Sequence, residues 1–297
     1  MCMNNYKQMA EDLELSGDYR VLHRLLNVAY YNEFPPTKIY IGVVVDTETT
    51  GLDHNADKII ELAMTPFIFD NEGKIYQVLE PYNTYNDPGM PIRPFITKLT
   101  GITDDMVAGK SIDHDEVQAM LDTADIVIAH NAKFDRKFLE DCHAGFVGIN
   151  WGCSLTDVDW AAEGIVGGKL DYLGFRFGYY FEGHRATVDV AATIHLLTQT
   201  MEKSGDLVMK QLWDNSKRTD YRVFARGAPF EMKDILKGRG YFWSPGGSGE
   251  PKAWFKDIED VDLANELVWL KTDIGIAMPD RLPMRQITAS NRFSERV

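Results

Sequence analysis

Five residues that could do chemistry stand where a fold could bring them together. Asp46 and Glu48 lie two residues apart, directly after the apolar run 38–45. Residues two apart on a strand point to the same face, so both carboxylates project together from the strand end. Carboxylates held together repel each other unless a cation lies between them. The pair therefore favours a cation site, and the alternative is a charged strand end that faces water.

The other three residues follow in two later segments of the chain. Asp135 ends the segment HNAKFD (130–135), directly after a second apolar run. Asp189 falls in the first turns of a predicted helix, and His184 stands just before that helix. Taken alone, Asp135 is equally an acid that stabilises a helix N-terminus. The order and spacing of all five residues are more specific than any one segment.

This set of residues suits the hydrolysis of a phosphate ester. Oxygen ligands select Mg²⁺ or Mn²⁺ over zinc, and two such ions about 3.5–4 Å apart stabilise both the attacking and the leaving oxygen. A histidine, with an ordinary pKa of about 6.5, can take a proton from the attacking water at neutral pH. The sequence therefore predicts two divalent cations, Mg²⁺ or Mn²⁺, held by carboxylates beside a histidine base.

The elements that must position these residues follow from periodicity. The nearly continuous apolar, β-branched run 38–45 indicates a strand covered on both faces. The other predicted strands are 58–69, 74–80, 125–130 and 149–155, and the predicted helices are 1–34, 94–99, 114–123, 133–142, 170–177 and 186–201. Opening strands followed by alternating helix and strand favour a mixed sheet with helices on both faces. We therefore expect an α/β fold, with an N-terminal helical extension over 1–36 that ends at the break Phe34-Pro35-Pro36.

Three segments carry a resemblance to a known family. DTETTGL (46–52), HNAKFD (130–135) and HRATVD (184–189) resemble the three motifs of the DnaQ-like, or DEDD, 3′–5′ exonucleases. Arg185 stands where the tyrosine form of the family would carry its tyrosine, so the histidine form, DEDDh, is the better match. LTGIT (99–103) also looks like the family's substrate-contact segment, although some members have His where Thr100 stands. The resemblance covers roughly 37–203 and implies a ribonuclease-H-like, mixed five-stranded sheet flanked by helices.

The resemblance also implies roles for individual residues. Asp46, Glu48, Asp135 and Asp189 would be metal ligands, and His184 would be the general base. The residues that would contact the terminal nucleotide or shape its pocket are Thr47, Thr49, Leu52, Ile102, Asn131 and Phe134. For Leu52 and Ile102 the alternative is ordinary core packing.

The implied activity is metal-dependent 3′–5′ exonuclease action that releases nucleoside 5′-monophosphates from single-stranded or frayed 3′ ends. DNA is the first choice of substrate, and an exoribonuclease of the same chemistry is the alternative. A non-catalytic nucleic-acid or polymerase-binding subunit is the rival from another class, but such a protein need not keep all five residues. The resemblance allows a polymerase or another protein as a partner, and the oligomeric state stays open.

The last third, 204–297, differs in composition and is expected to form a small α+β domain. It resembles small modules of poorly defined role that are appended to some bacterial and phage DnaQ-like proteins. It interleaves cations and aromatics that could track phosphates and stack bases, namely Lys233, Lys237, Arg239, Trp243 and Trp254. The alternative is that Trp243 and Trp254 form the core of this small domain, which needs its aromatics for stability.

Charge and composition set limits on the whole chain. The 297 residues carry a net charge of -14, which by itself disfavours a nucleic-acid ligand. Residues 1–204 hold 16 basic and 31 acidic residues, whereas 205–297 hold 15 and 14, so the acidity lies in the part with the predicted cation site. Three cysteines without a metal-binding spacing favour reduced thiols and a cytoplasmic protein. No run of 18 apolar residues occurs, so no membrane span is expected.

Overall fold

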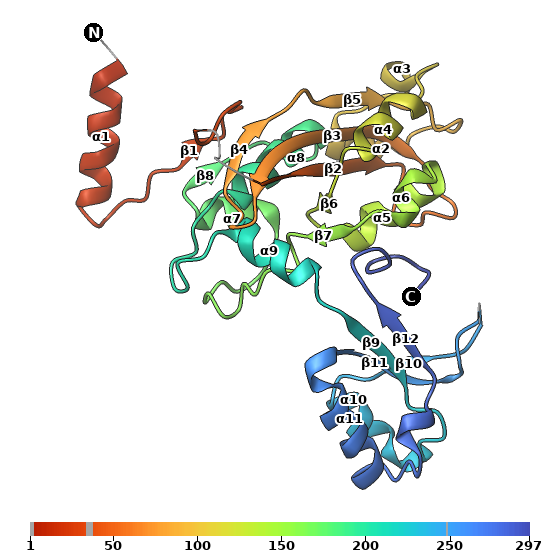
Figure 1. Ribbon diagram of the computed structural model, residues 1–297. Helices are drawn as coiled ribbons and strands as arrows, with labels where there is room; N and C mark the ends of the chain where they lie inside the picture. The colour runs from red at the N-terminus through yellow and green to blue at the C-terminus, as the bar shows by residue number, and fades with distance from the viewer. Residues whose placement is uncertain (1–2, 34–37, 248) are drawn as a thin grey trace. The chain divides into compact units, whose positions relative to one another are not determined.

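The computed structural model describes residues 3–33, 38–247 and 249–297 and is shown as a ribbon in Figure 1. Contacts within the chain divide it into two compact units, residues 1–215 and residues 216–297. Each unit has its own sheet and its own hydrophobic core. Within the described residues, no helix combines the length and apolar character needed to cross a membrane.

The first unit is built on a mixed sheet. The strand order is β4-β3-β2-β6-β7, and β5 also pairs with β3. β3 is antiparallel to β2, whereas β6 is parallel to both β2 and β7. The strands are β2 (Ile39–Thr49), β3 (Ile59–Asp70), β4 (Ile75–Val78), β5 (Tyr82–Tyr85), β6 (Ile126–Ala129) and β7 (Trp151–Cys153). The predicted mixed sheet is confirmed, and the unpredicted β5 makes six strands in place of five.

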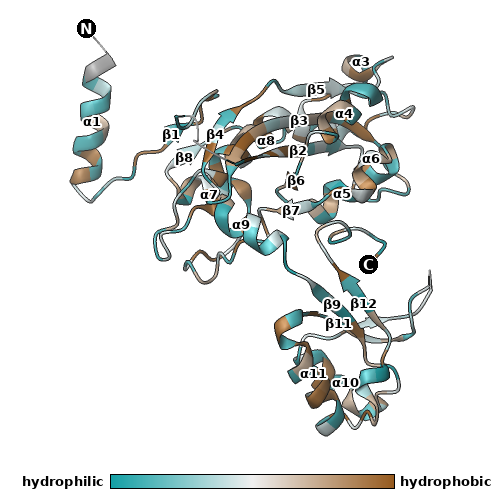
Figure 2. Ribbon diagram, viewed as in Figure 1, coloured by the Kyte–Doolittle hydropathy of each residue, from teal (hydrophilic) through white to brown (hydrophobic). Residues whose placement is uncertain are grey.

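Strand β2 lies in the middle of this sheet because its side chains are apolar on both faces. Val43, Val44 and Val45 are at most 1% exposed, and β3 and β6 pair with β2 on its two sides. Figure 2 shows hydrophobic residues, in brown, along β2 and β3. The pairing of β2 with β3 shifts register between Glu48 and Thr49. Such irregularities bend a strand and re-aim its side chains, and this one falls at the predicted cation site.

Helices cover the sheet and carry the rest of the predicted site. They are α2 (Pro94–Thr100), α3 (Asp104–Val107), α4 (His114–Leu121), α5 (Ala132–Cys142), α6 (Gly145–Gly148), α7 (Leu170–Arg176), α8 (Ala186–Leu197) and α9 (Val208–Ser216). α8 packs against β2 and β3, with Val190, Ile194 and Leu197 at most 2% exposed. Fully buried Ala186 and Ala192 let its backbone approach the sheet. This packing brings the start of α8 to the end of β2.

The predicted N-terminal helix over 1–34 is wrong for most of its length. Within the described residues 3–33, the helix is confined to α1 (Met3–Leu15), and Gly17 follows in the left-handed conformation. The next residues run along the edge of the first unit, where β1 (His23–Arg24) pairs in parallel with β8 (Tyr179–Tyr180). Further on, Tyr31 N–H donates to the Tyr76 carbonyl. Backbone pairing with a sheet edge therefore outweighs helical periodicity, and the break predicted at 34–36 lies outside the described residues.

The segment 201–220, predicted as a surface helix or linker, is partly a core element. Helix α9 buries Val208, Met209 and Leu212 completely in the core of the first unit. The boundary between the two units therefore falls between Asn215 and Ser216 along the chain, later than the proposed boundary at 203/204. The apolar positions of α9 are three and four residues apart, a spacing hidden by the polar average of the segment.

The second unit is a four-stranded antiparallel sheet with helices packed on one face. Its strand order is β10-β11-β9-β12. The elements are β9 (Asp220–Phe224), the 3₁₀ helix η1 (Phe230–Met232), α10 (Lys233–Gly238), β10 (Phe242–Ser244), β11 (Ala253–Glu259), α11 (Asp260–Thr272), the 3₁₀ helix η2 (Pro279–Arg281) and β12 (Met284–Ile287). Val223 and Ile258 of the sheet pack against Leu236 and Leu270 of the helices. The predicted small α+β architecture is thus confirmed.

Candidate active site

Three of the predicted metal ligands converge at the end of β2. Asp46 and Glu48 project from this strand, and Asp189 comes from the first turn of α8. One carboxylate oxygen from each residue lies within 4.8 Å of the oxygens from the other two. The β2–β3 register places Asp46 opposite Ala63, whose small side chain leaves this space to the carboxylates. The structure therefore brings together residues that lie 143 positions apart in the sequence.

Asp135, the fourth predicted ligand, is tied directly to the same strand. It lies in the first turn of α5 and is 4% exposed. One of its carboxylate oxygens accepts hydrogen bonds from the Thr47 backbone N–H (3.0 Å) and the Thr47 hydroxyl (2.8 Å). Thr47 lies between Asp46 and Glu48, so these bonds fix Asp135 beside the carboxylate group. Its second oxygen is the atom with which it could ligate a cation.

The loop before α8 is shaped around Asp189. The Asp189 carboxylate accepts hydrogen bonds from the backbone N–H groups of His184 (2.8 Å) and Arg185 (3.1 Å). His184 has a φ of 67°, in the left-handed region that non-glycine residues seldom adopt. Such backbone strain is concentrated at functional sites. The imidazole itself is exposed, so solvent water can reach it.

The carboxylates strongly disfavour being charged at the same time. Loss of solvation raises the pKa of Asp46 well above its usual range, and the neighbouring carboxylates, Asp135 first, raise it further. Burial, with the charges of Asp189 and Glu61, raises the pKa of Glu48 to about 8. Burial likewise raises the pKa of Asp189. A hard divalent cation would relieve this repulsion, and a set of oxygen ligands without thiolates fits Mg²⁺ or Mn²⁺.

These pKa shifts predict a metal effect on stability that grows with pH. The pKa of Glu48 is about 8 in the folded chain, against an ordinary value of 4.5. Folded protein therefore holds a proton that unfolded protein releases, and metal-free stability should fall as pH rises from about 4.5 to 8. A cation replaces that proton, so we expect Mg²⁺ to raise the Tm by about 5 °C or more at pH 8 and by much less near pH 5.5. Thermal melts with Mg²⁺ or chelator, at matched ionic strength, measure this, and an equal gain at both pH values would contradict it.

The predicted nucleotide contacts separate into exposed and buried residues. Leu52 is 86% exposed, so its alternative as a core residue is wrong, and Asn131 is exposed as well. Phe134 is partly buried, with its ring centroid 5.1 Å from that of Phe138. Ile102 is 0% exposed in a cluster with Ile60, Ile92, Ile96 and Val107. The Ile102 side chain therefore packs in the core, as the alternative expects, and its contact with the terminal nucleotide stays a prediction.

A hydrogen-bond network holds the loop after β2 and explains why Leu52 faces outward. Arg93 donates its Nε to the Thr50 carbonyl (3.0 Å) and its Nη2 to Asp57 (2.7 Å). The Thr50 hydroxyl donates to the same Asp57 carboxylate oxygen at 3.1 Å. Thr49, another predicted contact, is 6% exposed, and its hydroxyl donates to the Gly51 carbonyl. The loop is thus held by its own polar groups, which leaves the apolar Leu52 side chain in solvent.

Two residues that lie near the carboxylates were not predicted from the sequence as part of the site. Glu61 is fully buried on β3, directly opposite Glu48 in the strand register. Arg185 pairs with it, with Nη2 3.2 Å from a Glu61 carboxylate oxygen. A lone acid inside the apolar strand 59–69 was the available signal for Glu61. No signal in the sequence singled out Arg185 as its partner, because only the fold brings them together.

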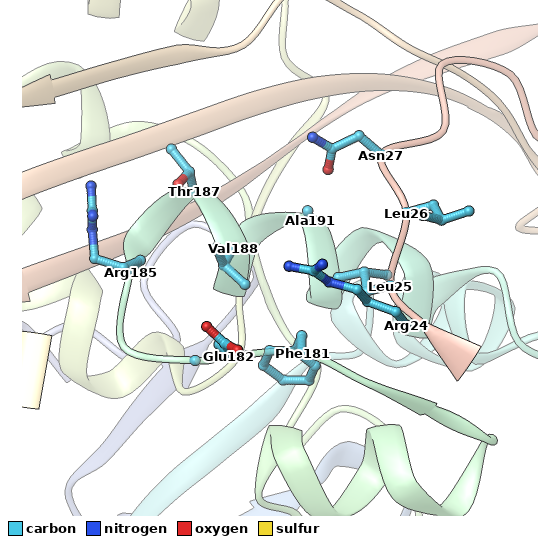
Figure 3. Close-up of a pocket in the computed structure, with 11 residues that line it drawn as sticks. Arg24, Leu25, Leu26, Asn27, Phe181, Glu182, Arg185, Thr187, Val188 and Ala191 are labelled. Atoms are coloured by element: carbon cyan, nitrogen blue, oxygen red, sulfur yellow. The ribbon is translucent and has the colours of Figure 1, made fainter. Parts of the chain in front are cut away.

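A cavity of about 540 Å³ lies beside the His184 loop. Figure 3 shows Arg24 and Asn27 of the N-terminal segment on one side, with Thr187, Val188 and Ala191 of α8 among the other lining residues. Arg185 lines this cavity, but none of the four predicted metal ligands does. The cavity is therefore a neighbour of the carboxylate group rather than its centre.

The predicted strand contacts of the second unit are partly used for its own packing. Arg239 binds Glu266, with distances of 2.8–3.1 Å, and lies 4.1 Å over the Trp269 ring. Trp254 is partly buried against the core, whereas Trp243 is 49% exposed. Arg239, although exposed, and partly buried Trp254 therefore already have partners within the unit, and their contact with a strand stays a prediction. The core alternative is correspondingly wrong for half-exposed Trp243.

The two lysines proposed for the same role remain accessible. Lys233 is exposed, with its Nζ 4.5 Å over the Phe230 ring, and Lys237 is exposed on the same helix. Phe230 is 76% exposed. Lys233, Lys237 and Trp243, together with Arg239, are thus the exposed members of the predicted set.

The chain is similar to parts of several known proteins. The DNA polymerase III PolC-type proteins of Caldanaerobacter subterraneus and Thermotoga maritima are 29% and 27% identical to the chain over 202 and 203 residues. These matches cover 65% and 66% of the chain but only 14% of each polymerase, so the chain spans a small part of these relatives. Among solved structures, exonuclease X in complex with 5′ overhanging duplex DNA is 23% identical, with a TM-score of 0.41, and the match covers 57% of this chain and 99% of that one.

A family model described as Exonuclease (RNase_T) matches residues 43–197, just over half of the chain. The matched residues contain the end of β2, the start of α5 and the start of α8. All four carboxylates and His184 therefore fall inside the match, and the predicted family is confirmed: the chain belongs to the exonuclease family.

Proposed function

We propose that this chain is a divalent-metal-dependent 3′–5′ exonuclease that removes nucleoside 5′-monophosphates from nucleic-acid 3′ ends. The observation that carries the proposal is the convergence of Asp46, Glu48 and Asp189 oxygens within 4.8 Å, inside a family match to exonucleases. Residues 38–215 would form the catalytic unit, and residues 216–297 would add contacts to the strand or to a partner. DNA is the proposed substrate, because the relatives at 27–29% identity are DNA polymerases by name.

Asp46, Glu48 and Asp189, with the second oxygen of Asp135, would hold two divalent ions. When bound, the ions supply positive charge that activates water and stabilises the leaving oxygen of the phosphodiester. The four carboxylates need opposite charge because burial, with repulsion from neighbouring carboxylates that include Glu61, already raises the pKa values of all four. The identity of the ion, Mg²⁺ or Mn²⁺, is part of the proposal.

His184 would act as the general base. Its backbone N–H is fixed to the Asp189 carboxylate, so the residue stays beside the carboxylate group while its imidazole remains open to water. A base held in this way can take the proton from the attacking water as the phosphorus–oxygen bond forms. Leu52 would lie against the terminal base, with Asn131 and Phe134 shaping the same pocket and Thr47 and Thr49 backing it.

The proposal is tested with a panel of matched DNA and RNA oligonucleotides, single-stranded and duplex. With a 5′ label and Mn²⁺, we expect a ladder of products shortened from the 3′ end, nucleoside 5′-monophosphates as the small product, and faster digestion of DNA. Faster digestion of RNA would favour the exoribonuclease alternative. Tight binding without products, from a folded protein loaded with Mn²⁺, would favour the non-catalytic alternative, for which a polymerase is the partner to test.

A further inference from the structure

Three neighbouring strands place a polar row next to the carboxylate group. In the sheet register, Glu48 of β2 lies opposite Glu61 of β3, and Glu61 lies opposite Tyr85 of β5. Like charges directly opposite each other on neighbouring strands are destabilising. Glu61 is also fully buried, and a buried charge without a partner is strongly destabilising. The fold must therefore supply a cation to Glu61.

Arg185 supplies that cation from the loop that begins the third motif. Its Nε and Nη2 donate to the two Glu61 carboxylate oxygens at 3.3 and 3.2 Å. The same Nη2 donates to the Tyr85 hydroxyl at 2.7 Å, and the guanidinium lies 5.8 Å from the centre of the Tyr85 ring. A two-pronged contact of this kind fixes the orientation of an arginine as well as its position.

The contact also fixes the start of α8. The Ala186 backbone N–H donates to Glu61 at 3.2 Å, so one buried carboxylate binds both the Arg185 side chain and the first residue of the helix. The residue before Arg185 is His184, and Asp189 accepts hydrogen bonds from the backbone N–H groups of both. Any shift of the Arg185 backbone would therefore move the proposed base and one proposed ligand together.

We propose that Arg185 and Glu61 form a clamp that positions His184 and Asp189 against the carboxylates of β2. The inference rests on the function proposed above and deepens it. Arg185 is a positioning residue that acts through the geometry of the loop, and Glu61 is its anchor rather than a further metal ligand. The clamp joins three separate parts of the chain: β3, β5 and the loop before α8.

The test removes the clamp without changing the net charge. The double variant Glu61→Gln/Arg185→Met loses one negative and one positive charge, so simple electrostatics leaves Mn²⁺ affinity unchanged. Loss of positioning should weaken Mn²⁺ binding by about 10–100-fold and lower kcat on a single-stranded oligonucleotide by a similar factor, with a smaller change in KM. Electron paramagnetic resonance of free Mn²⁺ gives the affinity without any need for turnover.

A matched control exists in the second unit. Arg222 binds both oxygens of Asp257 at 2.7 and 2.8 Å and lies 4.8 Å from the centre of the Phe255 ring. Arg222→Met/Asp257→Asn removes the same kind of contact, and we expect Mn²⁺ affinity and kcat within about twofold of the unmodified protein, because this pair shares no contact with Glu61 or Arg185.

A folded clamp variant with unchanged Mn²⁺ affinity and kcat would overturn the proposal. If that variant does not fold, Arg185→Lys replaces it, since lysine keeps the charge but lacks the fork; unchanged affinity and kcat would again refute the clamp. If the unmodified chain binds Mn²⁺ but hydrolyses no oligonucleotide, the proposed function fails. The Mn²⁺ affinities of the unmodified protein and the clamp variant still test the clamp in that case.

Discussion

Replacing Asp46 with asparagine is expected to reduce metal-dependent nucleotide release by about 10³-fold or more, which is about 4 kcal/mol at 1.36 kcal/mol per tenfold. Desolvation and the neighbouring carboxylates Asp135, Asp189 and Glu48 raise the pKa of Asp46 and disfavour its charge in the absence of metal. Asparagine keeps the shape of the side chain but removes the charge that would hold a cation. The measurement is the initial rate on a 5′-labelled single-stranded oligonucleotide with saturating Mn²⁺.

The same substitution should leave the metal-free protein at least as stable as the unmodified chain. Removing one of several neighbouring carboxylates relieves electrostatic repulsion in the metal-free protein. A fall in activity without a fall in Tm would therefore indicate that Asp46 serves function at the expense of stability. Asp122→Asn, at an exposed position at the end of α4, is the control and should change neither rate nor Tm. Full activity of a folded Asp46→Asn protein would exclude the proposed chemistry.

Replacing His184 with glycine or asparagine is expected to lower kcat by about 10²–10⁴-fold, the usual contribution of a positioned base. These two residues are chosen because His184 has a φ of 67°, which both tolerate better than alanine does. Since Asp189 accepts its hydrogen bond from the His184 backbone, neither substitution removes that contact. Mn²⁺ affinity should therefore stay within about threefold, a change of well under 1 kcal/mol.

The contrast between the two variants is the informative result. Asp46→Asn should lose both metal affinity and rate, whereas the His184 variants should lose rate alone. A His184 variant that binds Mn²⁺ normally and cleaves at the unmodified rate would remove the imidazole from the mechanism. Equal losses of metal affinity in both variants would instead make His184 a part of the metal site.

The parts of the fold that sequence could predict are those set by local pattern. The valine run of β2 has to be buried on both faces, so its position in the middle of the sheet, and the carboxylates at its end, follow from the residues themselves. Asp135 and Asp189 follow in the same way from the starts of α5 and α8. These short-range patterns are sufficient to recognise the three family motifs in the sequence.

What the sequence could not supply depends on contacts between distant segments. The pairing of Glu61 with Arg185 requires the register of β3 and the packing of α8, neither of which is written in the local pattern. Ile102 has a suitable position in its motif, but its burial among three other isoleucines and Val107 depends on tertiary packing. The N-terminal segment has helical spacing, yet backbone pairing at β8 decides its conformation.

In the proposed function, the end of β2 and the start of α8 form one divalent-metal centre. Diffraction from crystals soaked with Mn²⁺ and a nucleoside 5′-monophosphate, recorded for the anomalous signal of manganese, tests it most directly. We expect manganese peaks within coordination distance of Asp46, Glu48 and Asp189, with the phosphate of the nucleotide beside them and Leu52 against its base. Manganese bound elsewhere, with the oxygens of Asp46 and Asp189 free of metal at saturating Mn²⁺, would show that these residues do not form a metal centre.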